Sequence, residues 1–300
     1  ESLGLDDDIG ALISSVNEDG PAAKGGIQPG DVIVEFDGKL IEKMRDLPRI
    51  VAETDIGAKV KVRLFRQGNS ETVTVTSLTD DEEFDAYVAR PADTPKAAIV
   101  VIQEIFGVNA GIRRKCDKLA EDGYLAVAPD LFWRLEPGIE LDPDVEPEFQ
   151  RALDLMGKFN QDQGIRDIEA TIHHIREREG VKKVGAVGYC LGGRLAYMTA
   201  ARTDADATVG YYGVGIDELL REKNAIANPL MLHIPTEDGF VDKDTQKAMH
   251  DGLDDHPKVT LYDYEGLDHG FATEFGKRRS EDAAQLADKR TAEFFAEHLA

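Results

Sequence analysis

One cysteine stands in a sequence context that is typical of a catalytic nucleophile. The apolar run Val184–Val187 leads into Gly188-Tyr189-Cys190-Leu191-Gly192-Gly193 and then into residues that favour a helix. This order of strand, tight turn and helix matches the G-x-S-x-G pattern, with Cys in the place of Ser. The glycines leave room for a strained turn, and the partial positive charge at the start of a helix favours a thiolate. We therefore interpret Cys190 as a nucleophile; the alternative is a buried cysteine on a glycine-rich turn that takes part in no reaction.

A thiol nucleophile needs a base, and the base needs an acidic group that orients it. Two later loops offer these groups in a chain order known for such sites, with the nucleophile first, the acid second and the histidine last. Asp238 follows one apolar run, and His269 follows the next. Acidic residues are frequent in this chain and a lone histidine is usually structural, so neither loop is informative alone. Together with Cys190 they predict a triad, and we rank the neighbouring acids Glu237 and Asp268 below Asp238.

A further loop follows the apolar run Ile99–Ile102 and can complete the site. Its backbone N–H at Ile105, with that of Leu191, is expected to stabilise an oxyanion. Glu104 in this loop has two interpretations, a carboxylate that makes a structural hydrogen bond or one that acts in the reaction. The second cysteine, Cys116, is expected to pack within a helix.

The elements that must position these groups are buried strands that alternate with amphipathic helices. Strands are expected at Ala97–Ile102, Tyr124–Ala128, Val184–Val187, Ala207–Tyr211, Leu230–Ile234 and Val259–Tyr262. Helices are expected at Ile112–Asp122, Pro147–Lys158, Ile165–Glu179, Leu191–Ala201, Lys243–Leu253 and Glu281–His298. Continuously apolar strands are typical of a parallel sheet between helices, whose functional loops lie at the carboxyl ends of the strands. The pattern predicts an α/β fold.

The first part of the chain has a different pattern, with short runs in which apolar and polar residues alternate. These predict a small, β-rich unit with one helix. The strands are expected at Ala11–Val16, Asp31–Phe36, Lys59–Leu64 and Glu71–Val75, and the helix at Met44–Glu53. The polar segment Thr79–Glu83 marks the boundary, so we divide the chain into domains at 1–78 and 79–300.

The composition excludes several classes of function. In 300 residues, 35 Lys and Arg stand against 58 Asp and Glu, a formal net charge of −23. Such a surface repels nucleic acids and anionic membranes, so we expect neither as a partner. No apolar run reaches the roughly 20 residues of a membrane span, and the chain begins at Glu1 with no apolar leader. Two cysteines exclude a disulfide framework and a cysteine-only zinc site, and no motif predicts a metal or cofactor.

Four motifs together resemble the dienelactone hydrolases (carboxymethylenebutenolidases) over residues 83–300. They are Gln103-Glu104-Ile105-Phe106-Gly107-Val108-Asn109, Ala128-Pro129-Asp130-Leu131, Gly188–Gly193 and Gly210-Tyr211-Tyr212-Gly213-Val214-Gly215. The resemblance implies an α/β-hydrolase fold and an enzyme that opens a lactone or cleaves an ester through a covalent acyl-enzyme. It implies Cys190 as nucleophile, His269 as base and Asp238 as orienting acid. It further implies that Glu104 takes the thiol proton when substrate binds.

Two departures from the family pattern concern the substrate. The family uses two arginines to hold the carboxylate of its enol-lactone, and here Thr273 and a position near Phe149 stand in their places. Arg134 and Arg151 are candidate replacements, and Phe106 is a further candidate for substrate contact. Without a positioned guanidinium, an anionic lactone loses its charge-assisted hydrogen bonds. We therefore expect hydrolysis of a small ester or lactone without naming it.

The first unit is similar to the PDZ domains of HtrA-type proteases over residues 1–77. The similarity is carried by Gly20-Pro21-Ala22-Ala23-Lys24-Gly25-Gly26-Ile27-Gln28-Pro29-Gly30-Asp31-Val32-Ile33 and by Asp46–Val51. Such domains bind C-terminal peptides at a sheet edge. We expect the first strand and its carboxylate-binding loop to be missing, with Ser2–Leu5 as a weak stand-in, and Thr72–Val75 to replace an opening strand of the second unit. A fusion, natural or engineered, accounts for both.

The alternative function is therefore a peptide-binding adaptor whose second unit is a scaffold without turnover. A complete triad argues against it. Catalysis by a reduced thiol favours the cytoplasm, whereas the PDZ resemblance points to the bacterial envelope.

Overall fold

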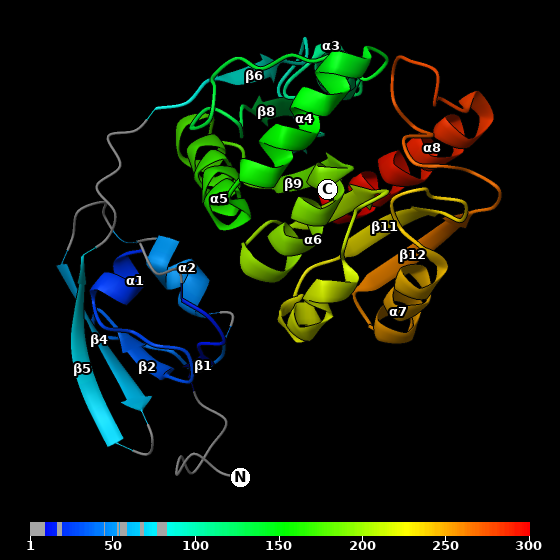
Figure 1. The fold of residues 1–300 in the computed structure, drawn as a ribbon. Coiled ribbons are helices and arrows are strands. Elements are labelled where there is room, and N and C mark those ends of the chain that lie inside the picture. Colours follow the sequence, from blue (N-terminus) through cyan, green and yellow to red (C-terminus); the bar gives the residue numbers. More distant parts are fainter. Residues whose placement is uncertain are drawn as a thin grey trace. The chain divides into compact units, whose positions relative to one another are not determined.

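The computed structural model describes residues 10–16, 20–44, 46–52, 54, 59–66, 69–76 and 83–300. The chain divides into two compact units, Glu1–Glu83 and Phe84–Ala300 (Figure 1). The predicted boundary at 78, most of the polar segment around it, and Ser2–Leu5 lie outside the described residues. No helix in the described ranges combines the length and apolar character that crossing a membrane requires.

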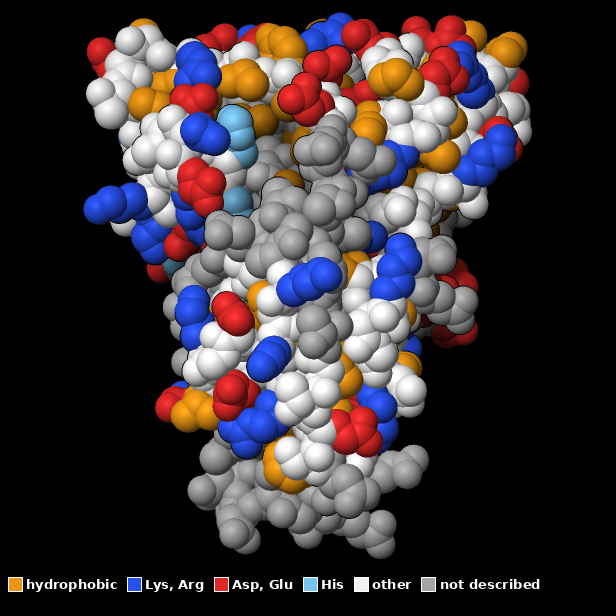
Figure 2. All heavy atoms as spheres, turned by 90° about the vertical axis from the view of Figure 1, so that its left-hand side faces the viewer, with side chains coloured by type: hydrophobic (Ala, Val, Ile, Leu, Met, Phe, Trp, Pro, Cys, Tyr) orange, Lys and Arg blue, Asp and Glu red, His pale blue; other side chains and the backbone are white. Residues whose placement is uncertain are grey.

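The first unit is an antiparallel sheet with two short helices. The strands run in the order β1-β2-β4-β5, and β3 pairs with β2. The elements are β1 (Ala11–Leu12), α1 (Pro21–Lys24), β2 (Val32–Phe36), β3 (Lys39–Leu40), α2 (Asp46–Ala52), β4 (Lys59–Arg66) and β5 (Asn69–Thr76). In β4, the buried Val60, Val62 and Leu64 alternate with the more exposed Lys59, Lys61 and Arg63, which is the alternation that predicted the strand. Figure 2 shows the face of the chain that lies on the left-hand side of Figure 1. On it, Lys and Arg side chains are interspersed with Asp and Glu side chains.

The four predicted strands and the helix of this unit are confirmed, although β1 is shorter than expected. Helix α1 and strand β3 were not predicted. Helix α1 begins at Pro21, where proline's fixed backbone angle suits the first helical position; the sequence analysis left this segment without an element. The expectation for Thr72–Val75 is wrong, because these residues pair antiparallel with Val60–Arg63 and belong to the first sheet.

The second unit contains a seven-stranded sheet in the order β12-β11-β10-β9-β7-β8-β6. Its strands are β6 (Ala86–Ala89), β7 (Ala98–Ile102), β8 (Leu125–Pro129), β9 (Val184–Tyr189), β10 (Ala207–Tyr211), β11 (Leu230–Pro235) and β12 (Val259–Tyr264). All pairs are parallel except β6 with β8, so β6 is the antiparallel edge strand of this sheet. The residues of β7 to β11 are buried throughout, as expected for strands covered on both faces.

Helices cover both faces of this sheet (Figure 1). They are α3 (Ala110–Glu121), α4 (Glu146–Lys158), α5 (Gln161–Arg178), α6 (Leu191–Arg202), η1 (Asp217–Ala225, a 3₁₀ helix), α7 (Lys243–Leu253) and α8 (Glu281–His298). Two glycines of β9 show that α6 and α8 lie on opposite faces. A Cβ on Gly185 would lie 3.0 Å from Phe295 of α8, and one on Gly188 would lie 1.9 Å from the carbonyl oxygen of Gly192 in α6. Residues three apart in a strand point to opposite faces. The six predicted strands and six predicted helices are confirmed, and so is the α/β-hydrolase fold class.

Candidate active site

Cys190 occupies a strained turn between β9 and α6. Its backbone angles are φ 55° and ψ −115°, a combination that L-residues rarely adopt. The Cys190 N–H donates to the carbonyl of Tyr211 at the end of β10, over 3.0 Å. A Cβ at Gly192 would lie 2.4 Å from the carbonyl oxygen of Ile102, so the start of α6 packs directly against the end of β7. The glycines thus allow the close packing that holds the turn, and backbone strain of this kind is concentrated at functional sites.

Asp238 and His269 form a buried pair on the loops that follow β11 and β12. The imidazole Nδ1 lies 3.0 Å from one carboxylate oxygen of Asp238 and 3.1 Å from the other. The N–H of Phe240 donates to the same carboxylate over 2.8 Å. The two side chains are buried, with 8% and 7% of each residue exposed. The carboxyl group of Asp238 can therefore hold one tautomer and one orientation of the ring.

The two neighbouring acids have other partners. One carboxylate oxygen of Asp268 accepts the N–H of Gly239 over 2.9 Å and the N–H of His269 over 2.7 Å. It ties together the two loops that carry the pair. Glu237 forms an exposed ion pair with a lysine. Of the three acids considered from the sequence, Asp238 is the one whose carboxylate contacts the His269 ring.

The environment of His269 favours its charged form when Cys190 is ionised. Burial alone lowers the pKa of the imidazole, but the negative charge of Cys190 and the hydrogen bonds to Asp238 and to Cys190 outweigh burial and raise the pKa of His269 to about 10. The ring therefore interacts with both groups. The structure brings the three residues of the predicted triad together at the carboxyl ends of parallel strands.

Glu104 lies in the loop after β7, and Tyr212 contacts both Glu104 and the imidazole of His269. Only 9% of this residue is exposed, and burial raises the pKa of its carboxyl group. The hydroxyl of Tyr212 donates to Glu104 over 3.4 Å, and the same ring packs edge-on against the His269 ring with centroids 5.0 Å apart. Tyr212 itself adopts φ 40° directly after β10. The sequence analysis did not predict a role for Tyr212, although the tyrosine pair before Gly213 was part of the resemblance.

The two expected oxyanion donors lie on the turns after β7 and β9. Leu191 is the first residue of α6, where a helix leaves its N–H without an internal partner. Among the described loop and turn contacts, neither its N–H nor that of Ile105 donates a hydrogen bond. Phe106, a predicted substrate contact, is buried, and its ring packs on Phe149 with centroids 5.8 Å apart.

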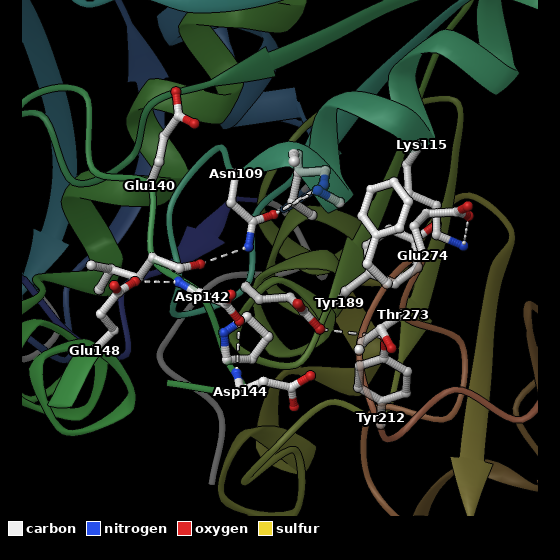
Figure 3. A pocket seen from close by; sticks show the side chains of 18 residues that line it. Asn109, Lys115, Glu140, Asp142, Asp144, Glu148, Tyr189, Tyr212, Thr273 and Glu274 are labelled. Atoms are coloured by element: carbon white, nitrogen blue, oxygen red, sulfur yellow. Dashed lines mark hydrogen bonds and ion pairs between the residues drawn. The ribbon is translucent and has the colours of Figure 1, made fainter. Parts of the chain in front are cut away.

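A cavity of about 340 Å³ opens beside Glu104 (Figure 3). Glu104 lines this cavity. Tyr189 and Tyr212 lie on one side of it, and Thr273 contributes to the wall next to Lys115 and Glu274. Cys190, Asp238 and His269 are not among the described lining residues. The far side carries four acidic residues, Glu140, Asp142, Asp144 and Glu148. The cavity adjoins the triad through Tyr212, whose ring packs against His269.

The two arginines predicted to contact substrate lie outside this lining. The guanidinium of Arg134 binds the buried carboxylate of Asp167 over 2.6 Å and stacks on the ring of Trp133. Arg151 pairs with Glu136 at the surface over 2.5 Å. Both guanidinium groups are thus engaged with acids that lie far from them in the sequence.

Cys116 is buried in α3 as a free thiol, as expected, and burial raises the pKa of this thiol. Across the described ranges, no three His, Cys, Asp or Glu side chains are grouped so that they could hold a metal ion.

Comparison with known proteins gives consistent matches for both units. The model of the dienelactone hydrolase family matches residues 84–299, and that of the PDZ domain matches residues 3–76. The protein named "Putative carboxymethylenebutenolidase" from Azospirillum brasilense is 44% identical over 224 residues, covering 73% of this chain and 96% of the relative. The carboxymethylenebutenolidase of Pseudomonas putida is 38% identical over 228 residues, covering 76% and 96%.

The solved structures agree with these matches. The crystal structure titled as a putative dienelactone hydrolase from Klebsiella pneumoniae superposes with a TM-score of 0.63 at 29% identity, covering 72% of this chain and 94% of that one. The family match spans more than half of the chain, and the relatives are covered almost completely. The chain is therefore a hydrolase that belongs to the dienelactone hydrolase family and carries a PDZ domain in its N-terminal unit.

Proposed function

We propose that this enzyme hydrolyses a small carboxylic ester or lactone through a covalent thioester on Cys190. One observation carries the proposal: the buried Asp238–His269 pair interacts with a cysteine on a strained strand-to-helix turn. A nucleophile, a base and a group that orients the base are the parts that this reaction needs. Glu104, buried beside them, supplies a carboxylate for the thiol proton.

Acylation begins when Glu104 takes the proton of the Cys190 thiol as substrate binds. The thiolate attacks the carbonyl carbon, a C–S bond forms, and the carbonyl electron pair moves onto the oxygen. The N–H groups of Ile105 and Leu191 stabilise this oxyanion. The intermediate then collapses, the C–O bond breaks, and the expelled oxygen takes the proton that Glu104 holds.

Deacylation uses the pair of His269 and Asp238. In the thioester the sulfur of Cys190 no longer carries the negative charge that raises the pKa of the imidazole, so a neutral ring becomes available as a base. It takes a proton from water, and the resulting hydroxide attacks the thioester carbonyl. The C–S bond breaks, and the departing thiolate takes the proton back from the imidazolium. The net reaction consumes one water and yields one acid and one alcohol.

The test compares the wild type with Cys190→Ala and Cys190→Ser on p-nitrophenyl acetate and on cis-dienelactone. We expect the wild type to hydrolyse the acetate and to gain the mass of one acetyl group in a rapidly quenched sample. Both signals should vanish in Cys190→Ala, while its circular dichroism stays unchanged. Cys190→Ser should be strongly impaired, because a hydroxyl is a weaker nucleophile. Full activity of Cys190→Ala would overturn the proposal.

Hydrolysis of cis-dienelactone tests whether the enzyme accepts an anionic lactone. The names of the relatives describe enzymes that open carboxymethylenebutenolide, which carries a carboxylate. Thr273 stands where the family pattern expects a guanidinium, so we propose that the neutral acetate is the better substrate. Efficient turnover of cis-dienelactone would show that another group holds its carboxylate.

The PDZ match favours a second function for residues 3–76, the binding of C-terminal peptides. Fluorescence anisotropy with free-acid peptides, and with the same peptides amidated as controls, tests this proposal. Binding that needs the free carboxylate would support it, and equal signals from both forms would contradict it. Peptide binding without any Cys190-dependent turnover would favour the adaptor function over the enzyme.

A further inference from the structure

We propose that the cavity beside Glu104 selects ester substrates by their charge. In this proposal kcat/KM is highest for a cationic ester, lower for a neutral one and lowest for an anionic one. Asp142, Asp144 and Glu148 form the wall that makes this selection; we call these three residues the acidic wall. The inference rests on the proposed function, because it takes this cavity as the place where substrate binds. It adds a class of substrate, an ester with a positively charged group.

The acidic wall lacks counter-ions. One carboxylate oxygen of Glu148 accepts the N–H of Asp142 over 2.6 Å, and Asp142 in turn accepts the N–H of Asp144 over 2.9 Å. Within the described chain, none of the three forms an ion pair with a lysine, arginine or histidine. Figure 3 shows them together on the side of the cavity away from Tyr189 and Tyr212. Their negative charges are therefore available to a ligand in the cavity.

Among the described lining residues, Lys115 is the one cationic side chain, and it is already neutralised. Lys115 is 6% exposed, and its ammonium group lies 3.0 Å from Glu274 and 3.3 Å from Asp288. The ammonium also lies over the ring of Tyr189, 5.0 Å from its centroid. A substrate carboxylate would have to displace a buried carboxylate to reach Lys115, which is costly because a buried charge would lose its partner.

Two further arginines near the cavity also have acidic partners, in more exposed ion pairs. Arg113 pairs with Glu140 over 2.6 Å. Arg278 lies outside the lining, 3.6 Å from Asp268 and over the ring of Phe240. The two positions at which the family pattern has arginine hold uncharged residues, so the lining, as far as the structure describes it, offers no unpaired cation to a carboxylate.

An anionic substrate would also hinder the proposed proton transfer to Glu104. Burial already raises the pKa of this carboxyl group, and a second negative charge nearby would raise it further. Glu104 would then be less able to take the thiol proton in the proposed reaction. A positively charged group would act in the opposite direction, so the same charges affect both binding and reactivity.

The test uses three acetate esters of similar size: acetylcholine, its neutral isostere 3,3-dimethylbutyl acetate, and 3-acetoxypropanoate. Released acid is followed by pH-stat titration, and kcat/KM is compared at low and high ionic strength. We expect about tenfold steps between the three esters at low salt and smaller steps in about 0.5 M salt, since salt screens exposed charges. An anionic ester that is hydrolysed as fast as the cationic one would overturn the inference.

Two triple variants separate the acidic wall from the charge of the whole chain. The first is Asp142→Asn with Asp144→Asn and Glu148→Gln. The control is Glu177→Gln with Asp255→Asn and Glu297→Gln, three exposed acids outside the lining that form no ion pair with another described residue. Both remove three negative charges. We expect the first variant to reduce the ratio of cationic to anionic kcat/KM to about twofold, and the control to leave it unchanged.

The outcomes distinguish the inference from the proposed function. Equal loss of selectivity in both variants would assign the effect to net charge and overturn the inference, while the proposed function would stand. If none of the three esters is turned over in a manner that depends on Cys190, the proposed function fails and the inference fails with it.

Discussion

Replacing Tyr212 by Phe removes one hydroxyl from the site and keeps the ring. The hydroxyl donates to Glu104 over 3.4 Å, whereas the ring packs edge-on against His269 and Phe271. The hydrogen bond lowers the pKa of Glu104 and so opposes the effect of burial. In the proposed reaction Glu104 must be ionised to take the thiol proton. Loss of the hydroxyl should therefore weaken the enzyme on the acidic side of its pH profile.

The size of the effect follows from the geometry of the bond. A short hydrogen bond to a charged group contributes about 1.5–3 kcal/mol, and at 3.4 Å we assign about 1 kcal/mol. Loss of this bond destabilises the ionised carboxylate and should raise the pKa of Glu104; about 1 kcal/mol is about a fivefold change in an equilibrium constant. Below that pKa, kcat/KM should fall about fivefold; well above it, kcat/KM should equal that of the wild type.

The assay is the pH dependence of kcat/KM for p-nitrophenyl acetate. Tyr211→Phe is the matched control, because the hydroxyl of Tyr211 bonds to Thr291 over 2.6 Å and to Asp288 over 3.2 Å, and has no bond to Glu104. It should lower stability without moving the acidic limb. Superimposable acidic limbs for Tyr212→Phe and the wild type would refute the reasoning.

Three further predictions address the triad, the strained turn between β9 and α6, and the core. Asp238→Asn should lower kcat by about 10²–10⁴, because the His269 ring loses its orienting charge; stopped-flow kinetics at saturating ester would measure this, and a loss below tenfold would contradict it. Gly188→Ala should prevent stable folding, since its Cβ would lie 1.9 Å from a backbone oxygen, whereas Gly157→Ala, with open space around it, should stabilise by up to about 1 kcal/mol in urea unfolding. Equal stabilities of the two variants would argue against the close packing of Gly188 on the start of α6. Burial lowers the pKa of His233 to about 3, so its imidazole should be neutral at pH 5 by NMR, and the stability it contributes should be lost as the pH falls from about 6.5 towards 3; a protonated ring at pH 5 would contradict this.

The sequence was sufficient for the parts of the site that depend on local pattern. Cys190 could be placed because glycines on both sides of it mark a strand that turns sharply into a helix. Asp238 and His269 could be placed because each follows an apolar run, and parallel strands bring such loops to one edge of a sheet. Helices α7 and α8 match their predicted bounds, since both have a regular apolar stripe.

The remaining features depend on contacts between residues far apart in the chain. Lys115 is buried because Glu274 and Asp288 neutralise it, and a charged residue on a helix would otherwise be expected at the surface. The guanidinium of Arg134, a predicted substrate contact, binds Asp167, and the sequence around these two residues does not indicate that they meet. The role of Tyr212 depends on its neighbours in space, which the pattern of one strand does not reveal.

Asp268 couples the motion of the loop after β11 to that of the loop after β12. Because one carboxylate oxygen accepts the N–H groups of both Gly239 and His269, neither amide can reach solvent unless that shared anchor is released. Opening of either loop should then be a single concerted event, so that both amides show the same protection factor in hydrogen exchange. Because this anchor joins the loop that carries Asp238 to the loop that carries His269, we expect a motion of one loop to move the acid and the base together.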